Sequence, residues 1–124
     1  MTAEERLTGV IGLCVRARQA VFGEDSCVKT LRAGGSTLLL LDGEASGNTR
    51  KKYEETCRRA GAELWMLPRG LLGAATGKPG VAMAVLEGSL AKQVVLRLTE
   101  VPEGVEKVNL SANNGGGARV EWRK

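Results

Sequence analysis

Hydrophobic residues follow two alternating patterns along the first 98 residues of the chain. Spacings of three and four residues, as in Leu7, Val10, Ile11 and Cys14, predict helices that bury one face. Short uninterrupted apolar runs, such as 38–41, predict strands buried on both faces. Helices are predicted over residues 4–18, 24–32, 48–60, 71–76 and 89–98, and strands over 20–22, 37–41, 63–67 and 81–86. This alternation predicts an α/β fold, a three-layer α/β/α sandwich around a central sheet.

The pattern changes after residue 98. We therefore expect a sandwich domain over residues 1–98 and a C-terminal extension over residues 99–124. In the extension Val108 and Leu110 alternate with polar neighbours, as do Val120 and Trp122, on either side of an Asn/Gly-rich run. The extension is either a hairpin that turns at this run or a flexible tail, and the pattern leaves both open.

Composition excludes several classes of protein. With 124 residues and 43% hydrophobic residues the chain can bury one core, and with 3% aromatic residues it has no row of platforms for stacking single-stranded bases. Cys14, Cys27 and Cys57 are far apart and fall in apolar helical patterns, so we expect core residues of a protein in a reducing compartment. The first residues do not resemble a signal peptide, and no apolar run could cross a bilayer. We expect a cytoplasmic protein with no membrane partner.

Two stretches invite comparison with catalytic motifs. The two glycines before Lys78 are separated by three residues where a phosphate loop has four, and Pro79 stands where that motif needs Ser or Thr. Asp42 and Glu44 follow an apolar strand, where carboxylates can hold Mg²⁺ or transfer protons, but a solvated turn is the favoured interpretation. The chain has no histidine, which excludes the common nucleophile–base pairs. We therefore expect no enzyme, metal, cofactor or small-molecule substrate.

The polar stretch 23–29 opens the second predicted helix. A helix start offers free N–H donors, and Gly23 lets a ligand approach the backbone closely. Glu24, Asp25 and Ser26 can accept hydrogen bonds, and Lys29 follows one turn later. Carboxylates repel phosphate, so they suit exposed base edges, which RNA offers where its helix is broken or bent. A local ion pair between Asp25 and Lys29 is the alternative.

Basic residues near this stretch suit a polyanionic partner. The net charge of the chain is +4, which agrees with such a partner without requiring one. Arg50, Lys51 and Lys52 open the third helix, where cations oppose the helix dipole. They form either a phosphate-contacting face or a solvated helix surface, and the sequence leaves both open.

In their order and spacing, several pieces of the chain resemble the L-seven-Ae/L-thirty-e family of ribosomal-type RNA-binding proteins, and its small bacterial members in particular. The resemblance covers residues 7–98. The matching pieces are Gly12-Leu13 with Arg16-Ala17, Gly23-Glu24-Asp25 with Lys29, the run 38–42 with Ala45-Ser46 and residues 48–52, Leu72-Gly73, Gly77-Lys78, and residues 81–85.

The resemblance implies a sandwich with a central mixed sheet that binds kink-turn RNA, a sharply bent internal loop with tandem sheared G·A pairs, in a ribosome- or translation-associated setting. Where the family uses a glycine, an Asn-Glu pair and a lysine, this chain has Gly23, Asp25, Ser26 and Lys29, so an amide donor and a long carboxylate are missing. The resemblance also implies that the loop before the last strand packs beside the bent RNA. The expected RNA contacts are Gly23, Glu24, Asp25, Ser26 and Lys29 at the helix start, Lys78, Pro79, Gly80 and Val81 in the loop, and Arg16, Arg18, Arg32, Arg50 and Lys51 on phosphates.

The expected partner is thus structured RNA, with ribosomal RNA and the ribosome among the candidates. The alternative is a protein–protein interaction module of a ribonucleoprotein whose RNA recognition has degenerated.

Overall fold

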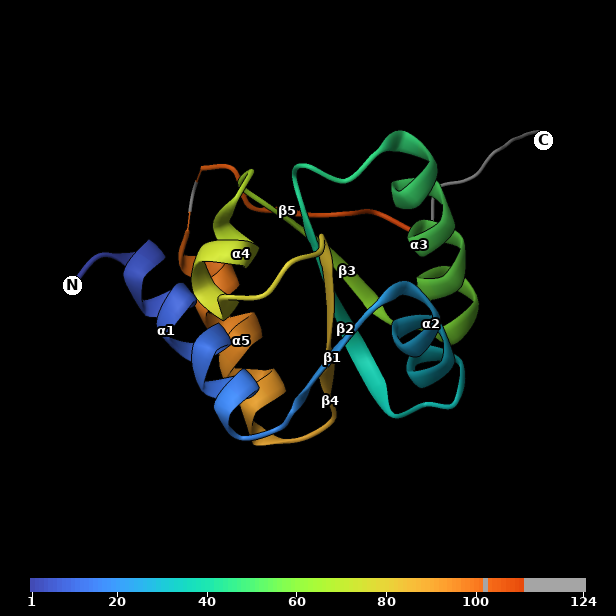
Figure 1. Ribbon diagram of the computed structural model, residues 1–124, viewed down its shortest axis with the longest axis horizontal. Helices are drawn as coiled ribbons and strands as arrows, with labels where there is room; N and C mark the ends of the chain where they lie inside the picture. Colours follow the sequence, from blue (N-terminus) through green and yellow to red (C-terminus); the bar gives the residue numbers. More distant parts are fainter. Residues whose placement is uncertain (102, 111–124) are drawn as a thin grey trace.

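The computed structural model describes residues 1–101 and 103–110, and in this part the predicted α/β/α sandwich is confirmed (Figure 1). The predicted bounds of helices and strands lie within two residues of those observed. In chain order the elements are α1 (Ala3–Arg16), β1 (Ala20–Phe22), α2 (Glu24–Arg32), β2 (Ser36–Asp42), α3 (Gly47–Ala60), β3 (Glu63–Leu67), α4 (Leu71–Thr76), β4 (Ala82–Leu86), α5 (Ser89–Glu100) and β5 (Glu106–Lys107).

The sheet is mixed and has the strand order β1-β4-β2-β3-β5. Strands β2 and β3 run parallel, and every other neighbouring pair is antiparallel. Side chains of β2 alternate between the two cores: Leu38 and Leu40 belong to one cluster, Leu39 and Leu41 to the other. This is the physical reason for the uninterrupted apolar run, because both faces of a central strand are covered by helices.

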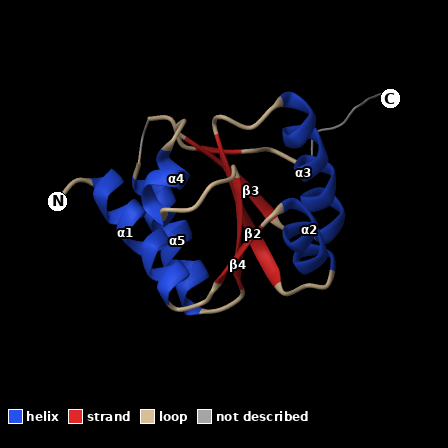
Figure 2. Ribbon diagram, viewed as in Figure 1, coloured by secondary structure: helices blue, strands red, loops and turns tan. Residues whose placement is uncertain are grey.

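Helices cover the two faces unequally (Figure 2). One layer holds α1, α4 and α5, and the other holds α2 and α3. The three cysteines are fully buried, as predicted, with Cys14 in the first layer and Cys27 and Cys57 in the second. Burial raises the pKa of each thiol, to about 12 for Cys57, so these groups stay protonated at neutral pH. None of the helices in the described ranges is long and apolar enough to cross a membrane.

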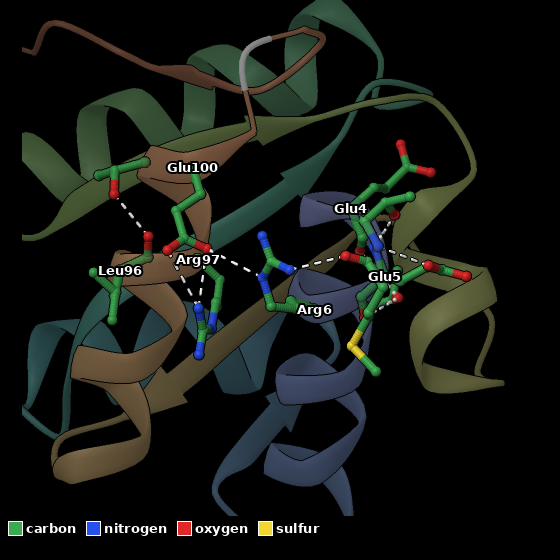
Figure 3. A network of polar contacts seen from close by, with 10 residues as sticks. Glu4, Glu5, Arg6, Leu96, Arg97 and Glu100 are labelled. Carbon is green, nitrogen blue, oxygen red and sulfur yellow. Dashed lines mark hydrogen bonds and ion pairs between the residues drawn. The ribbon is translucent and has the colours of Figure 1, made fainter.

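A polar network fastens the start of α1 to the end of α5 (Figure 3). Thr2 and Glu5 form a capping box, with the Thr2 N–H donating to Glu5 over 2.8 Å and the Glu5 N–H donating to Thr2 over 3.0 Å. Arg6 donates to the Met1 carbonyl over 2.9 Å and lies 3.6 Å from the Glu100 carboxylate, which also accepts hydrogen bonds from Arg97. The contact between α1 and α5 is therefore stabilised by an ion pair as well as by apolar packing.

Residues beyond α5 return to the sheet. Strand β5 pairs with the outer edge of β3, and the Val108 N–H donates to the Leu64 carbonyl over 2.9 Å. The Leu110 carbonyl accepts from Arg58 of α3 over 3.1 Å, and Val108 and Leu110 pack against the α2/α3 core. The described part of the extension thus covers a sheet edge. The Asn/Gly run of the alternative hairpin, together with Val120 and Trp122, lies outside the described residues.

Candidate nucleic-acid interface

Three chain segments meet at one end of the sheet. Phe22 at the end of β1 pairs with Met83 near the start of β4, so Gly23 lies beside the loop that enters β4. The Asp42 N–H at the end of β2 donates to the Val81 carbonyl over 2.7 Å. The starts of α2 and α3 follow β1 and the β2–α3 turn, and both therefore stand at this end of the sheet.

Gly23 is the N-cap of α2, and its backbone requires glycine. Its φ of 89° and ψ of 140° lie in a region that residues with a Cβ rarely adopt. No atom lies within 4 Å of the position a Cβ would occupy, so the space outside Gly23 is open. No side chain caps this helix start, and its first N–H groups are available to a ligand.

The remaining polar residues of α2 separate onto two faces. Asp25, Lys29 and Arg32, at successive turns, line an open groove of about 570 Å³ between α2 and α3, together with Val28, Ala33 and Lys52. No ion pair joins Asp25 to Lys29 in the described part of the chain. Ser26 is exposed but does not line the groove. The structure thus brings Asp25, Lys29 and Arg32 together and leaves Ser26 apart.

Lys52 is a groove residue that the predicted contact set omits. Its ammonium group forms an ion pair with Glu24 across the two helices, and both side chains are about half exposed, at 47% and 45%. Of the two cations predicted in this helix turn, Arg50 pairs with Glu54 over 2.9 Å and Lys51 is exposed. The sequence signal for Lys52 is the basic run 50–52 in which it lies, for which a phosphate-contacting face and a solvated helix surface were both open.

The loop 77–81 stands beside the start of α2. The Lys78 ammonium lies 5.7 Å from the centre of the Phe22 ring, the residue directly before Gly23. Such a cation–π contact at an exposed site contributes about 0.5–1 kcal/mol. Pro79 and Gly80 are exposed, while Val81 is partly buried against the α2/α3 core. The predicted second wall of the site is therefore adjacent to the helix start.

Asp42 fixes the segment that leads to this loop. Its carboxylate accepts hydrogen bonds from the N–H groups of Glu44 (3.0 Å), Gly70 (2.9 Å) and Leu72 (3.1 Å), the last two at the start of α4. The interpretation of a solvated turn is wrong for Asp42, because only 2% of the residue is exposed. A carboxylate suits a helix N-terminus, so Asp42 anchors α4, and α4 runs directly into the loop. Among the described residues no three His, Cys, Asp or Glu side chains are grouped as metal ligands.

The two arginines predicted at the end of α1 lie in different places. An Arg16 guanidinium nitrogen is 3.4 Å from the position of a Gly12 Cβ, and that position is 3.2 Å from the Ala75 carbonyl. Arg16 therefore lies near the end of α4, where the loop 77–81 begins. Arg18 lies in the turn before β1, at the opposite end of that strand from Gly23.

Comparison with known proteins places the chain in a family. No family model matches it. It is 34% identical over 88 residues to the RNA-binding protein YlxQ of Bacillus subtilis, which covers 69% of this chain and 88% of YlxQ. The chain belongs to the family of YlxQ. This supports the family-level resemblance found in the sequence, while the narrower likeness to small bacterial kink-turn binders stays a prediction.

Solved structures share the fold of this YlxQ relative. A protein of unknown function from Bacillus halodurans is 29% identical, with a TM-score of 0.71 over 77% of this chain and 98% of the other. A 15.5kD RNA binding protein of Giardia lamblia is 14% identical, with a TM-score of 0.59 over 80% of this chain and 90% of the other. At that identity the second likeness shows the fold alone.

Proposed function

We propose that the chain binds structured RNA where the start of α2 meets the loop 77–81. One observation carries the proposal: Lys78 lies over Phe22, so the loop stands beside Gly23 and the uncapped helix start. Together these provide backbone donors, carboxylate acceptors and a cation within one surface. The name of the relative YlxQ, an RNA-binding protein, supports the same function.

The preferred RNA in this proposal is a kink-turn or a similarly bent element, in a ribosome- or translation-associated setting. Bent RNA exposes base edges, while regular duplexes hide them. The carboxylates of Glu24 and Asp25 can accept hydrogen bonds from the donor groups on these edges. A protein that binds the bent form better than the extended one stabilises it by the difference. Phosphates are contacted by the cations around the start of α2, namely Lys29, Arg32, Arg50, Lys51 and Arg16. The bend of the RNA packs on the loop residues Lys78, Pro79, Gly80 and Val81.

A titration with two RNA duplexes tests this function. One contains a kink-turn with tandem sheared G·A pairs, and the other replaces these with Watson–Crick pairs. We expect the full chain to bind the first at least about tenfold more tightly, since a shape-specific site separates the two while phosphate attraction does not. Equal affinities would leave only general attraction to a polyanion and would refute recognition of bent RNA.

A protein-interaction module within a ribonucleoprotein is the second candidate. One observation favours it: Ser26, which replaces a long acidic side chain of the family pattern, does not line the groove. This alternative predicts no RNA preference in the same titration and recovery of a defined protein partner by the immobilised chain.

A further inference from the structure

The charge of the residues that line the groove between α2 and α3 changes along its length. Asp25 lies in the first turn of α2, Lys29 in the second and Arg32 in the third, so a carboxylate is followed by two cations over about 10 Å of helix. Lys52 adds a third cation from α3, and the apolar lining comes from Val28 and Ala33. Acceptors thus lie near the helix start and cation donors lie farther along.

Lys29 and Arg32 have no ion-pair partner among the described residues, and both are exposed. Counting the Glu24 carboxylate that pairs with Lys52, the groove has three cations and two carboxylates. Its concave, open surface therefore carries net positive charge, which suits a chain of phosphates rather than a single neutral ligand. We propose that this groove holds the sugar–phosphate backbone of the RNA strand whose bases meet the start of α2, with Lys52 as a phosphate contact. The proposal rests on the proposed function and adds the path of the strand: away from Gly23 along α2, and not towards Arg18.

Glu24 acts as a competitor in this arrangement. Its carboxylate holds the Lys52 ammonium in the free protein, and because both side chains are half exposed the pair is weak. A phosphate entering the groove takes the place of the Glu24 carboxylate on Lys52. Replacing Glu24 with glutamine keeps a carbonyl oxygen that can accept from a base and removes the competing charge.

Two substitutions and their combination, measured in the full chain with the kink-turn duplex over a series of salt concentrations, test the path. Lys52→Ala weakens binding about fivefold and lowers the slope of log affinity against log salt by about one contact. Glu24→Gln tightens binding by about two- to threefold, because the Lys52 ammonium is then free to bind phosphate. This gain disappears in the Lys52→Ala background, where no ammonium is present for Glu24 to occupy. Lys92→Ala, an exposed cation of α5 in the opposite layer, is the matched control and leaves affinity and slope unchanged.

The possible outcomes distinguish the proposed path of the strand along the groove from the proposed recognition of bent RNA at the helix start. If Lys52→Ala and Arg32→Ala both bind with unchanged affinity and slope while Lys29→Ala binds weakly, the groove is not the path, and RNA recognition at the helix start stands. If the chain does not distinguish the bent duplex from its control but Lys52→Ala still lowers the slope, the groove is a phosphate track and recognition of bent RNA is wrong. Failure to bind either duplex overturns both. Unfolding curves of each variant confirm that the fold is kept.

Discussion

The two helical layers cover the same sheet but use their charges differently. Helices α1, α4 and α5 carry four cations and three carboxylates, whereas α2 and α3 carry seven cations and four carboxylates. In the first layer Arg6, Arg97 and Glu100 join two helices to each other (Figure 3). In the second layer Lys52 pairs with Glu24 between α2 and α3, and Arg50, Arg58 and Arg59 pair with glutamates inside α3. Lys29 and Arg32, which line the groove, have no ion-pair partner among the described residues.

This difference separates charges that hold the sandwich together from charges that are available to a partner. Ion pairs between helices fix a geometry, although exposed pairs contribute only about 0–1 kcal/mol each. Unpaired cations that line a groove repel one another and are retained at a cost in stability unless a polyanion neutralises them. In the proposed function, RNA accordingly binds to the α2/α3 layer.

Charge reversal in the groove should have the largest effect on RNA binding. Lys29→Glu places a second carboxylate beside Asp25 in the groove, and we expect affinity for the kink-turn duplex to fall about 100-fold, near 2.7 kcal/mol. Lys92→Glu makes the same change in net charge on α5, and it should reduce affinity by about twofold through the overall field alone. Equal losses for both variants, measured by titration at one salt concentration, would show that only net charge matters.

Two glycines, one in each layer, should respond in opposite directions to alanine. Gly23→Ala forces a Cβ onto a backbone with φ of 89° and should destabilise the fold by about 1–2 kcal/mol. Gly9 lies inside α1, where a Cβ would meet no atom within 4 Å, so Gly9→Ala should stabilise by roughly 1 kcal/mol through helix propensity. Urea unfolding measures both, and a stabilising Gly23→Ala would mean that this helix start does not need its backbone geometry.

The local parts of this structure were predictable from the sequence, and the contacts between distant segments were not. Residues 38–41 predicted a strand buried on both faces because apolar periodicity is a property of neighbouring residues. The Glu24–Lys52 pair joins positions 28 residues apart and depends on how α2 packs against α3, which spacing does not encode. Asp42 was misjudged for the same reason, since two of its three donors lie 28 and 30 residues away.

Arg18, which follows the end of α1, should affect the stability of the fold but not RNA binding. Arg18 has a φ of 59° and follows α1 as Gly34 and Gly61 follow α2 and α3. The Gln19 and Arg18 N–H groups close this end by donating to Cys14 and Val15 carbonyls over 2.8 and 3.1 Å. Arg18→Gly relieves the left-handed conformation and should stabilise the fold by about 0.5–1 kcal/mol.

The same variant also removes one of the predicted phosphate contacts. With the strand running along α2, Arg18→Gly should bind the kink-turn duplex with nearly unchanged affinity. A loss as large as that of Lys29→Ala would instead direct the RNA towards the end of α1. Thermal unfolding and the RNA titration are measured on the same preparation.

The smallest expected effect concerns one carboxyl in each layer. Hydrogen bonds from Arg97 lower the pKa of Glu100, and hydrogen bonds from Arg59 lower the pKa of Glu55. A carboxyl whose pKa is lower in the folded state stabilises the fold above its ordinary pKa, and this stabilisation is lost as pH falls through the folded value. Glu100→Gln and Glu55→Gln should therefore each make the acid loss of stability less steep below about pH 4.5.

The two variants should nevertheless differ in size. The Glu55 pairs are local to α3, so any residual helix in the unfolded chain retains them and part of their effect cancels between the two states. The Glu100 pair with Arg6 joins α1 to α5 and exists only when the layer is assembled. Urea unfolding at a series of pH values should show the larger change for Glu100→Gln, and the reverse order would mean that the charges between helices do not hold the first layer together.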